Sequence, residues 1–89
     1  MKITIELSLY PLVEDYTSII VDFIKSLKSN DSIKVYSTAM STYVSGDYDI
    51  VMQIVTTELK KVHILIPDSS TVMKIIPKDL NVENGFLDF

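Results

Sequence analysis

The chain has 89 residues, of which 47% are hydrophobic, so it can form one domain around a single core. It has eight lysines, no arginine and twelve acidic residues, and its net charge of −4 disfavours binding to nucleic-acid phosphates. It has no cysteine, which excludes disulfides, iron–sulfur clusters and thiolate metal sites.

No apolar run reaches the roughly 20 residues of a membrane span, and no secretory hydrophobic region follows Met1. We therefore expect a cytoplasmic protein without membrane contact.

The first predicted elements are a strand and a helix. Apolar and polar side chains alternate over residues 2–10, which indicates a strand with one buried face, and Pro11 ends it. Asp15 can cap a helix over residues 16–28, where apolar side chains recur every three or four positions and lysines occupy the last turn. The polar cluster at 29–32 predicts a turn.

Two strands are predicted next, over residues 33–38 and 41–45, with a tight connection near Ala39 and Met40. We expect Val44 to face inward and Tyr43 outward, whereas a bulge near Met40 would exchange them. Gly46 predicts a turn because its backbone is little restricted, and Asp47 can cap the following helix.

The second helix carries an apolar stripe from residue 48 to residue 62, and residues 62–66 either continue it or begin an extended segment. Pro67 and the polar residues after it break either one, and residues 71–76 predict a last strand. We expect 1–89 to form a single domain. Its C-terminal tail, residues 78–89, has apolar side chains that could dock on a surface or a neighbouring subunit.

The order strand, helix, strand, strand, helix, strand predicts an α+β, ferredoxin-like βαββαβ sandwich. It has a four-stranded antiparallel sheet with both helices on one face. The other face stays open, and there we expect hydroxyl groups, a carboxylate and aromatic rings to gather from the first and third strands. Such groups suit a planar heteroaromatic ligand, but open sheet faces also serve as oligomer interfaces, and both interpretations remain.

No residue pattern predicts catalysis. His63 is the only histidine and has no predicted partner, so we interpret it as a helix-end residue. Asp47 and Asp49 are better explained as acids in the first turn of a helix than as a catalytic pair. The serines lack an activating base, and the sequence calls for no catalytic residue, metal or cofactor.

Four segments carry a resemblance that spans nearly the whole chain. They are Glu6-Leu7-Ser8-Leu9-Tyr10-Pro11-Leu12, Ala39-Met40-Ser41-Thr42, Gly46-Asp47-Tyr48-Asp49 with Val51-Met52, and Val72-Met73-Lys74-Ile75-Ile76. In this order they resemble the thiamine-binding, YkoF-like family. The resemblance implies a ferredoxin-like fold, a homo-oligomer (dimer or tetramer), and non-enzymatic binding of thiamine or its hydroxymethylpyrimidine moiety.

The expected ligand site follows from that resemblance. Thr38, Ser8 or Ser41 could match the donors and acceptors of an aminopyrimidine, and Glu6 or Asp47 could meet an amino group or cation. The ring face could contact one of the larger side chains, namely Met40, Tyr10, Tyr43 or Tyr48. The alternative is a structural or regulatory interaction module that uses the open face for oligomerisation and binds no small ligand. A third interpretation is that the protein is an enzyme.

Overall fold

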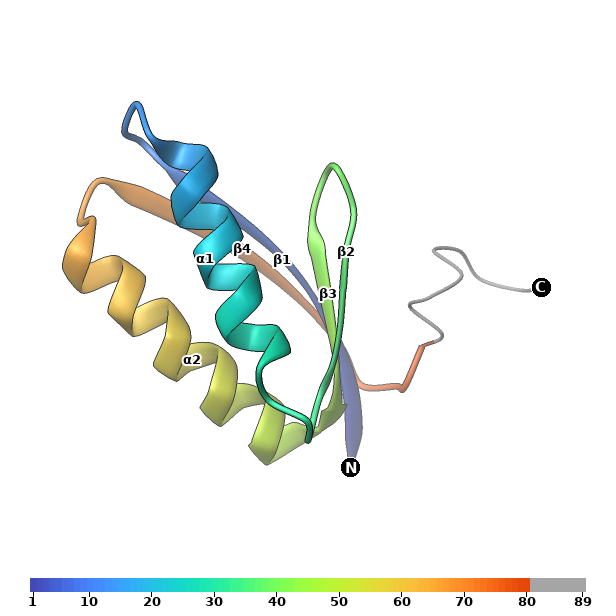
Figure 1. The fold of residues 1–89 in the computed structure, drawn as a ribbon. Helices are drawn as coiled ribbons and strands as arrows, with labels where there is room; N and C mark the ends of the chain where they lie inside the picture. The colour runs from blue at the N-terminus through green and yellow to red at the C-terminus, as the bar shows by residue number, and fades with distance from the viewer. Residues whose placement is uncertain (81–89) are drawn as a thin grey trace.

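The computed structural model describes residues 1–80. Six elements follow one another: β1 (Lys2–Pro11), α1 (Tyr16–Lys28), β2 (Lys34–Ser37), β3 (Thr42–Asp47), α2 (Tyr48–Leu65) and β4 (Ser69–Ile76). All strand pairs are antiparallel, and the sheet order is β2-β3-β1-β4. Both helices cover one face of the sheet (Figure 1). The predicted ferredoxin-like sandwich is confirmed.

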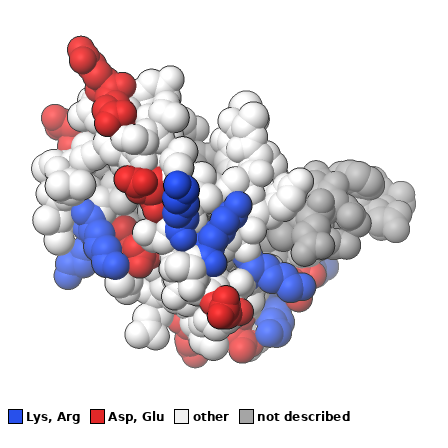
Figure 2. All heavy atoms as spheres, viewed as in Figure 1, with Lys and Arg blue, Asp and Glu red and all other residues white. Residues whose placement is uncertain are grey.

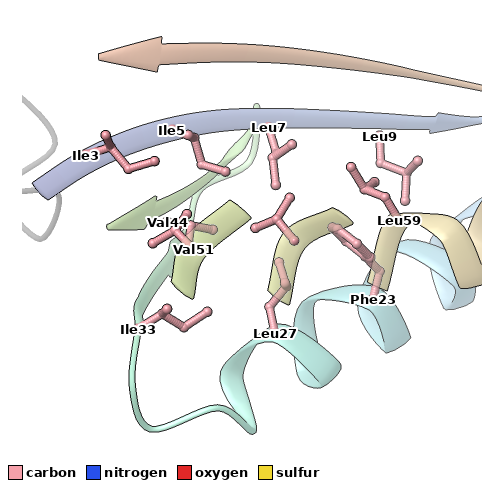
Figure 3. Close-up of a cluster of buried hydrophobic side chains, with 11 residues drawn as sticks. Ile3, Ile5, Leu7, Leu9, Phe23, Leu27, Ile33, Val44, Val51 and Leu59 are labelled. Carbon is pink, nitrogen blue, oxygen red and sulfur yellow. The ribbon is translucent and has the colours of Figure 1, made fainter. Parts of the chain in front are cut away.

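The core lies between the sheet and the helices, and β1 supplies its centre. The alternation in β1 directs one set of side chains toward the helices, where they meet the inner stripes of α1 and α2 (Figure 3). The buried cluster consists of Ile3, Ile5, Leu7, Leu9, Phe23, Leu27, Ile33, Val44, Val51, Val55 and Leu59. Burying each such side chain contributes about 1.5–3 kcal/mol, which explains why the amphipathic pattern alone predicts these elements.

Strand register fixes which side chains share a face. Val44 lies opposite Ile5 and is fully buried, whereas Tyr43 lies opposite Glu6 on the open face. Pairing between β1 and β3 runs without interruption from Lys2–Asp47 to Leu7–Thr42. The expected orientation of Val44 and Tyr43 is therefore confirmed, and the alternative with a bulge near Met40 is wrong.

The junction between β3 and α2 differs from the prediction. Gly46 lies inside β3 with a φ of +154°, and the helix begins two residues later without an intervening turn. Asp47 occupies the N-cap position but makes no side-chain cap, and its carboxylate lies 3.5 Å from the Lys2 ammonium. Asp15 likewise makes no cap to the backbone and accepts a hydrogen bond from Ser18 Oγ at 2.7 Å. Both predicted side-chain caps are wrong.

The structure shows where α2 ends and where β4 begins. Residues 62–65 continue the helix, so the extended alternative is wrong there. β4 begins at Ser69, two residues before the predicted start, because its pairing with β1 continues to Pro11–Ser69. The Leu12 N–H donates to the Asp68 carbonyl oxygen at 2.8 Å, one step beyond the Pro11–Ser69 pair.

After β4 the chain turns toward the first residues of β1. Thr4 Oγ1 donates to the Lys78 carbonyl oxygen at 2.8 Å and accepts from the Leu80 N–H at 2.9 Å. Most of the expected tail, with its docking side chains, lies outside the described residues. Within residues 1–80, no helix has both the length and the apolar character needed to cross a bilayer.

Candidate functional site

β1 is longer than its neighbour β3, and this mismatch creates a gap in the sheet. The β1–β3 ladder ends at Leu7–Thr42, whereas the β1–β4 ladder continues to Pro11–Ser69. Within residues 1–80, the last four residues of β1 therefore have a strand neighbour on the β4 side only. Where β3 would have continued, the chain instead forms the β2–β3 hairpin connection, residues 38–41.

A cavity of about 360 Å³ occupies this gap. It is bounded by the end of β1, residues 16–24 of α1 and the hairpin connection. Its apolar walls come from Leu7, Leu9, Ile20, Phe23 and Ile24, and its aromatic rings from Tyr10 and Tyr16. The hairpin contributes residues 38–42, and Ser8, Pro11 and Leu12 complete the lining.

None of the fifteen lining residues is charged. In Figure 2 the tip of the β2–β3 hairpin appears as an uncharged lobe. Hydroxyl groups and backbone amides are therefore the polar groups that the cavity presents, and aromatic and aliphatic side chains form the rest. This combination is typical of sites for small, flat, uncharged ring systems.

Thr38 shapes the hairpin side of the cavity. Its Oγ1 accepts hydrogen bonds from the N–H groups of Met40 at 3.1 Å and Ser41 at 3.2 Å, and it donates to the Ser41 carbonyl oxygen at 3.1 Å. The Thr38 N–H donates to the same carbonyl at 2.9 Å. These bonds use the one donor and both acceptor positions of the hydroxyl, so Thr38 organises the turn.

A polar cluster lies on the open face, directly behind the cavity. Ser41 Oγ donates to Glu6 Oε2 at 3.0 Å, and Lys74 Nζ lies 3.5 Å from Glu6 Oε1. The Ser41 hydroxyl holds the pKa of Glu6 below its usual value, with further contributions from Tyr43 and Lys74, while partial burial acts in the opposite direction. Glu6 is therefore a carboxylate at neutral pH.

The comparisons with known proteins assign the chain to a family. The family model described as thiamine-binding protein matches residues 5–80. The chain belongs to the thiamine-binding protein family. The match includes the whole cavity and the Glu6 cluster, so both features lie within the part of the chain that matches the family. Among curated proteins, none matches the chain.

Solved structures resemble the chain over nearly its full length. A Streptococcus pneumoniae protein has a TM-score of 0.81 at 22% identity, covering 96% of this chain and 97% of its own. A Thermotoga maritima protein, provisionally assigned to thiamine biosynthesis or salvage, has a TM-score of 0.78 at 20% identity, with coverages of 96% and 95%. A hypothetical Methanocaldococcus protein has a TM-score of 0.75 at 24% identity, with coverages of 94% and 91%. These likenesses show a shared fold.

The nine expected site residues fall into three groups. Five line the cavity: Ser8, Tyr10, Thr38, Met40 and Ser41. Glu6 and Tyr43 lie next to them on the open face. Asp47 and Tyr48 lie at the other end of β3, where Tyr48 N–H donates to the Met1 carbonyl oxygen at 2.8 Å. The structure brings the first seven together and separates the last two from them.

Sequence reasoning missed the contribution of α1 to this site. It placed the site on the open face, whereas the cavity opens between the sheet and α1, with Tyr16, Ile20, Phe23 and Ile24 on its wall. The sequence held no signal for this wall, because the apolar spacing that predicts the helix includes Tyr16 among its inner positions, whereas the structure leaves Tyr16 55% exposed. An exposed aromatic ring beside a strand end is a feature of ligand sites.

Within residues 1–80, no three histidine or acidic side chains come together in a way that could hold a metal ion. His63 Nε2 lies 3.0 Å from Thr71 Oγ1 near the end of α2, away from the cavity.

Proposed function

We propose that this protein binds thiamine or its hydroxymethylpyrimidine moiety, without converting it, in the cavity between α1 and the end of β1. The observation that carries the proposal is the uncharged cavity, with its two tyrosines and its hydroxyl-bearing hairpin, inside the region that matches the thiamine-binding family. The similarity to the Thermotoga maritima protein supports the same class of ligand.

The size of the cavity favours a single substituted ring. Small-molecule sites span roughly 300–1,000 Å³, and this cavity of about 360 Å³ lies at the lower end of that range. In this proposal the pyrimidine lies between the wall formed by α1, which includes Tyr16, and the ring of Tyr10 on β1, and the remainder of thiamine is directed to the opening. The acidic net charge of the chain is compatible with a cationic thiazolium outside the cavity.

Binding without chemistry is supported by the state of the hydroxyl groups. Ser41 donates to Glu6, and the low pKa of Glu6 makes this carboxylate a weak base at neutral pH. Thr38 has its hydroxyl engaged by the hairpin backbone. Neither hydroxyl is therefore an activated nucleophile.

The proposal includes a homo-oligomer, dimer or tetramer, that forms through the open face of the sheet. Large side chains remain exposed there although they belong to a sheet: Val72 is 50% exposed, Ile76 43% and Tyr36 39%. Apolar groups of this size on a sheet face are typical of protein–protein contacts. The same exposed side chains favour the second candidate, an interaction module that uses this face and binds no small ligand.

Calorimetric titration of the protein with thiamine and with hydroxymethylpyrimidine tests the ligand. We expect binding to the wild type and at least a tenfold loss in Ile20→Trp, because the indole fills the cavity. Val21→Trp, on the exposed neighbour of Ile20 outside the cavity, is the matched control and should bind as the wild type does. No heat and no thermal shift at millimolar ligand would refute the proposal.

Sedimentation analysis separates the two candidates. Val72→Glu places a charge on the open face, and Ile64→Glu, at an exposed apolar position of α2, makes a matched change elsewhere. We expect dissociation in the first variant only. An oligomer that dissociates in Val72→Glu while the wild type binds neither ligand would favour the interaction module.

A further inference from the structure

Leu9 of β1 pairs with Thr71 of β4 but has no β3 residue on its other side, and it remains in the core. Leu9 follows the last β1–β3 pair by two positions, and it is 9% exposed. Two observations show where its backbone points. The Leu12 N–H donates to the Asp68 carbonyl oxygen, so the even-numbered residues of β1 direct their N–H and C=O groups toward β4. The Tyr48 N–H donates to the Met1 carbonyl oxygen, so the odd-numbered residues direct theirs toward β3.

The Leu9 N–H and C=O therefore point into the gap where β3 has ended. In a continued ladder they would bond to residue 40, but the Met40 N–H already donates to Thr38 Oγ1, and Met40 is 86% exposed. Ser8, Leu9 and Tyr10 all line the cavity, so the free edge forms part of its wall. The next odd-numbered residue is Pro11, which has no N–H to leave without a partner.

This edge presents one donor and one acceptor side by side in an apolar surround. A buried backbone amide without a partner is unfavourable, whereas a ligand that offers a matching acceptor and donor replaces the two missing ladder bonds. An aminopyrimidine has such an edge, because a ring nitrogen with a free lone pair stands next to an exocyclic amino group. Its flat ring can then lie in the plane of the sheet as an extra residue of β3 would.

We infer that Leu9 recognises the ligand through its main chain. Its N–H donates a hydrogen bond to the ring nitrogen, and its C=O accepts one from the adjacent amino group. The inference rests on the proposed function and makes it more specific, since it selects planar heterocycles with neighbouring acceptor and donor atoms. The side chains of the cavity then select the shape of the ligand, and the Leu9 main chain selects its hydrogen-bonding groups.

Amide hydrogen exchange followed by nuclear magnetic resonance tests the inference on the unmodified full chain. On addition of hydroxymethylpyrimidine, we expect the Leu9 amide to shift and its exchange to slow by about tenfold or more. The Met73 amide is the internal control, since the alternation in β4 directs it to the outer edge of the sheet. Ligand-induced shifts elsewhere with an unchanged Leu9 amide would overturn the inference and leave the proposed function intact. A complete lack of ligand-induced shifts would refute both the inference and the proposed function.

A backbone substitution gives the second test. Replacing Leu9 by its hydroxy-acid analogue exchanges the N–H for an ester oxygen and keeps the side chain that the core requires. We expect about a tenfold loss of affinity for hydroxymethylpyrimidine and little loss for an analogue with C–H in place of the ring nitrogen beside the amino group. Equal losses for both ligands would contradict the assignment of the Leu9 N–H to that nitrogen.

Discussion

Ser41 donates a hydrogen bond to Glu6 across 3.0 Å and thereby ties the hairpin connection to the centre of β1. The two residues belong to different functional surroundings, because Ser41 lines the cavity whereas Glu6 lies on the open face. A change in the charge of Glu6 is therefore expected to affect the hairpin that encloses the cavity.

Acid is expected to weaken the fold through Glu6. Because the pKa of Glu6 is lower in the folded protein than the usual 4.5, its contribution to stability is present above pH 4.5 and is lost as the pH falls through the folded-state value. We predict that Glu6→Gln flattens the acid part of a plot of Tm against pH. Ser41→Ala should flatten it in part, because it removes the largest cause of the shift. An unchanged slope in Glu6→Gln would contradict this account.

Thr38 is expected to control the hairpin through its hydroxyl. Thr38→Ala leaves the N–H groups of Met40 and Ser41 without their acceptor, and we predict a loss of about 1 kcal/mol in the free energy of unfolding, with weaker ligand binding. Thr38→Ser keeps the oxygen and should restore both properties. Urea denaturation and calorimetry measure them. A serine variant as impaired as the alanine variant would assign the effect to the methyl group.

Gly46 is expected to tolerate no side chain. Its φ of +154° is rarely adopted by other residues, and a Cβ at this position would lie 3.2 Å from Val51 Cγ2 in the core. We predict that Gly46→Ala lowers the free energy of unfolding by about 1–3 kcal/mol. Gln53→Ala on the exposed side of α2 should change it by less than about 0.5 kcal/mol. Similar urea midpoints for the two variants would show that the strand relaxes around the new methyl group.

Phosphorylated thiamine is expected to bind less tightly than thiamine. The cavity has no charged lining residue, the chain has no arginine, and the net charge is −4, so a phosphate gains no ionic partner and meets a repulsive field. We predict at least a tenfold preference for thiamine over its diphosphate at low salt, decreasing as salt is added. Equal affinities in a competition titration would place the phosphate in contact with a lysine outside the cavity.

The fold was predictable because a few patterns determine it. The alternation in β1 and the apolar stripes of the two helices specify which side chains are buried, and the order of elements then leaves few topologies. The side-chain caps were not predictable in the same way. Asp47 has two possible partners, the helix backbone and Lys2, and only the register of β1 against β3 brings Lys2 within reach.

The site was predictable only in part, and for a physical reason. Hydroxyl and aromatic residues near Ser8 and Ser41 predicted a site at one end of the sheet, and five of the nine expected residues line the cavity there. The cavity itself depends on where the β1–β3 ladder stops, and no residue type encodes that point. The role that we infer for Leu9 lies in its backbone, so its side chain, which belongs to the core, gives no indication of it.

The unequal strand lengths described above suggest a means of redesigning this protein. β1 has ten residues, β3 six and β2 four, so the length of the hairpin, more than the identity of its side chains, decides how much of β1 is left unpaired. Two residues added to each arm would let β3 reach Leu9 and close the cavity with main-chain bonds. Shortening the arms would open it toward Leu7 and admit a longer ligand.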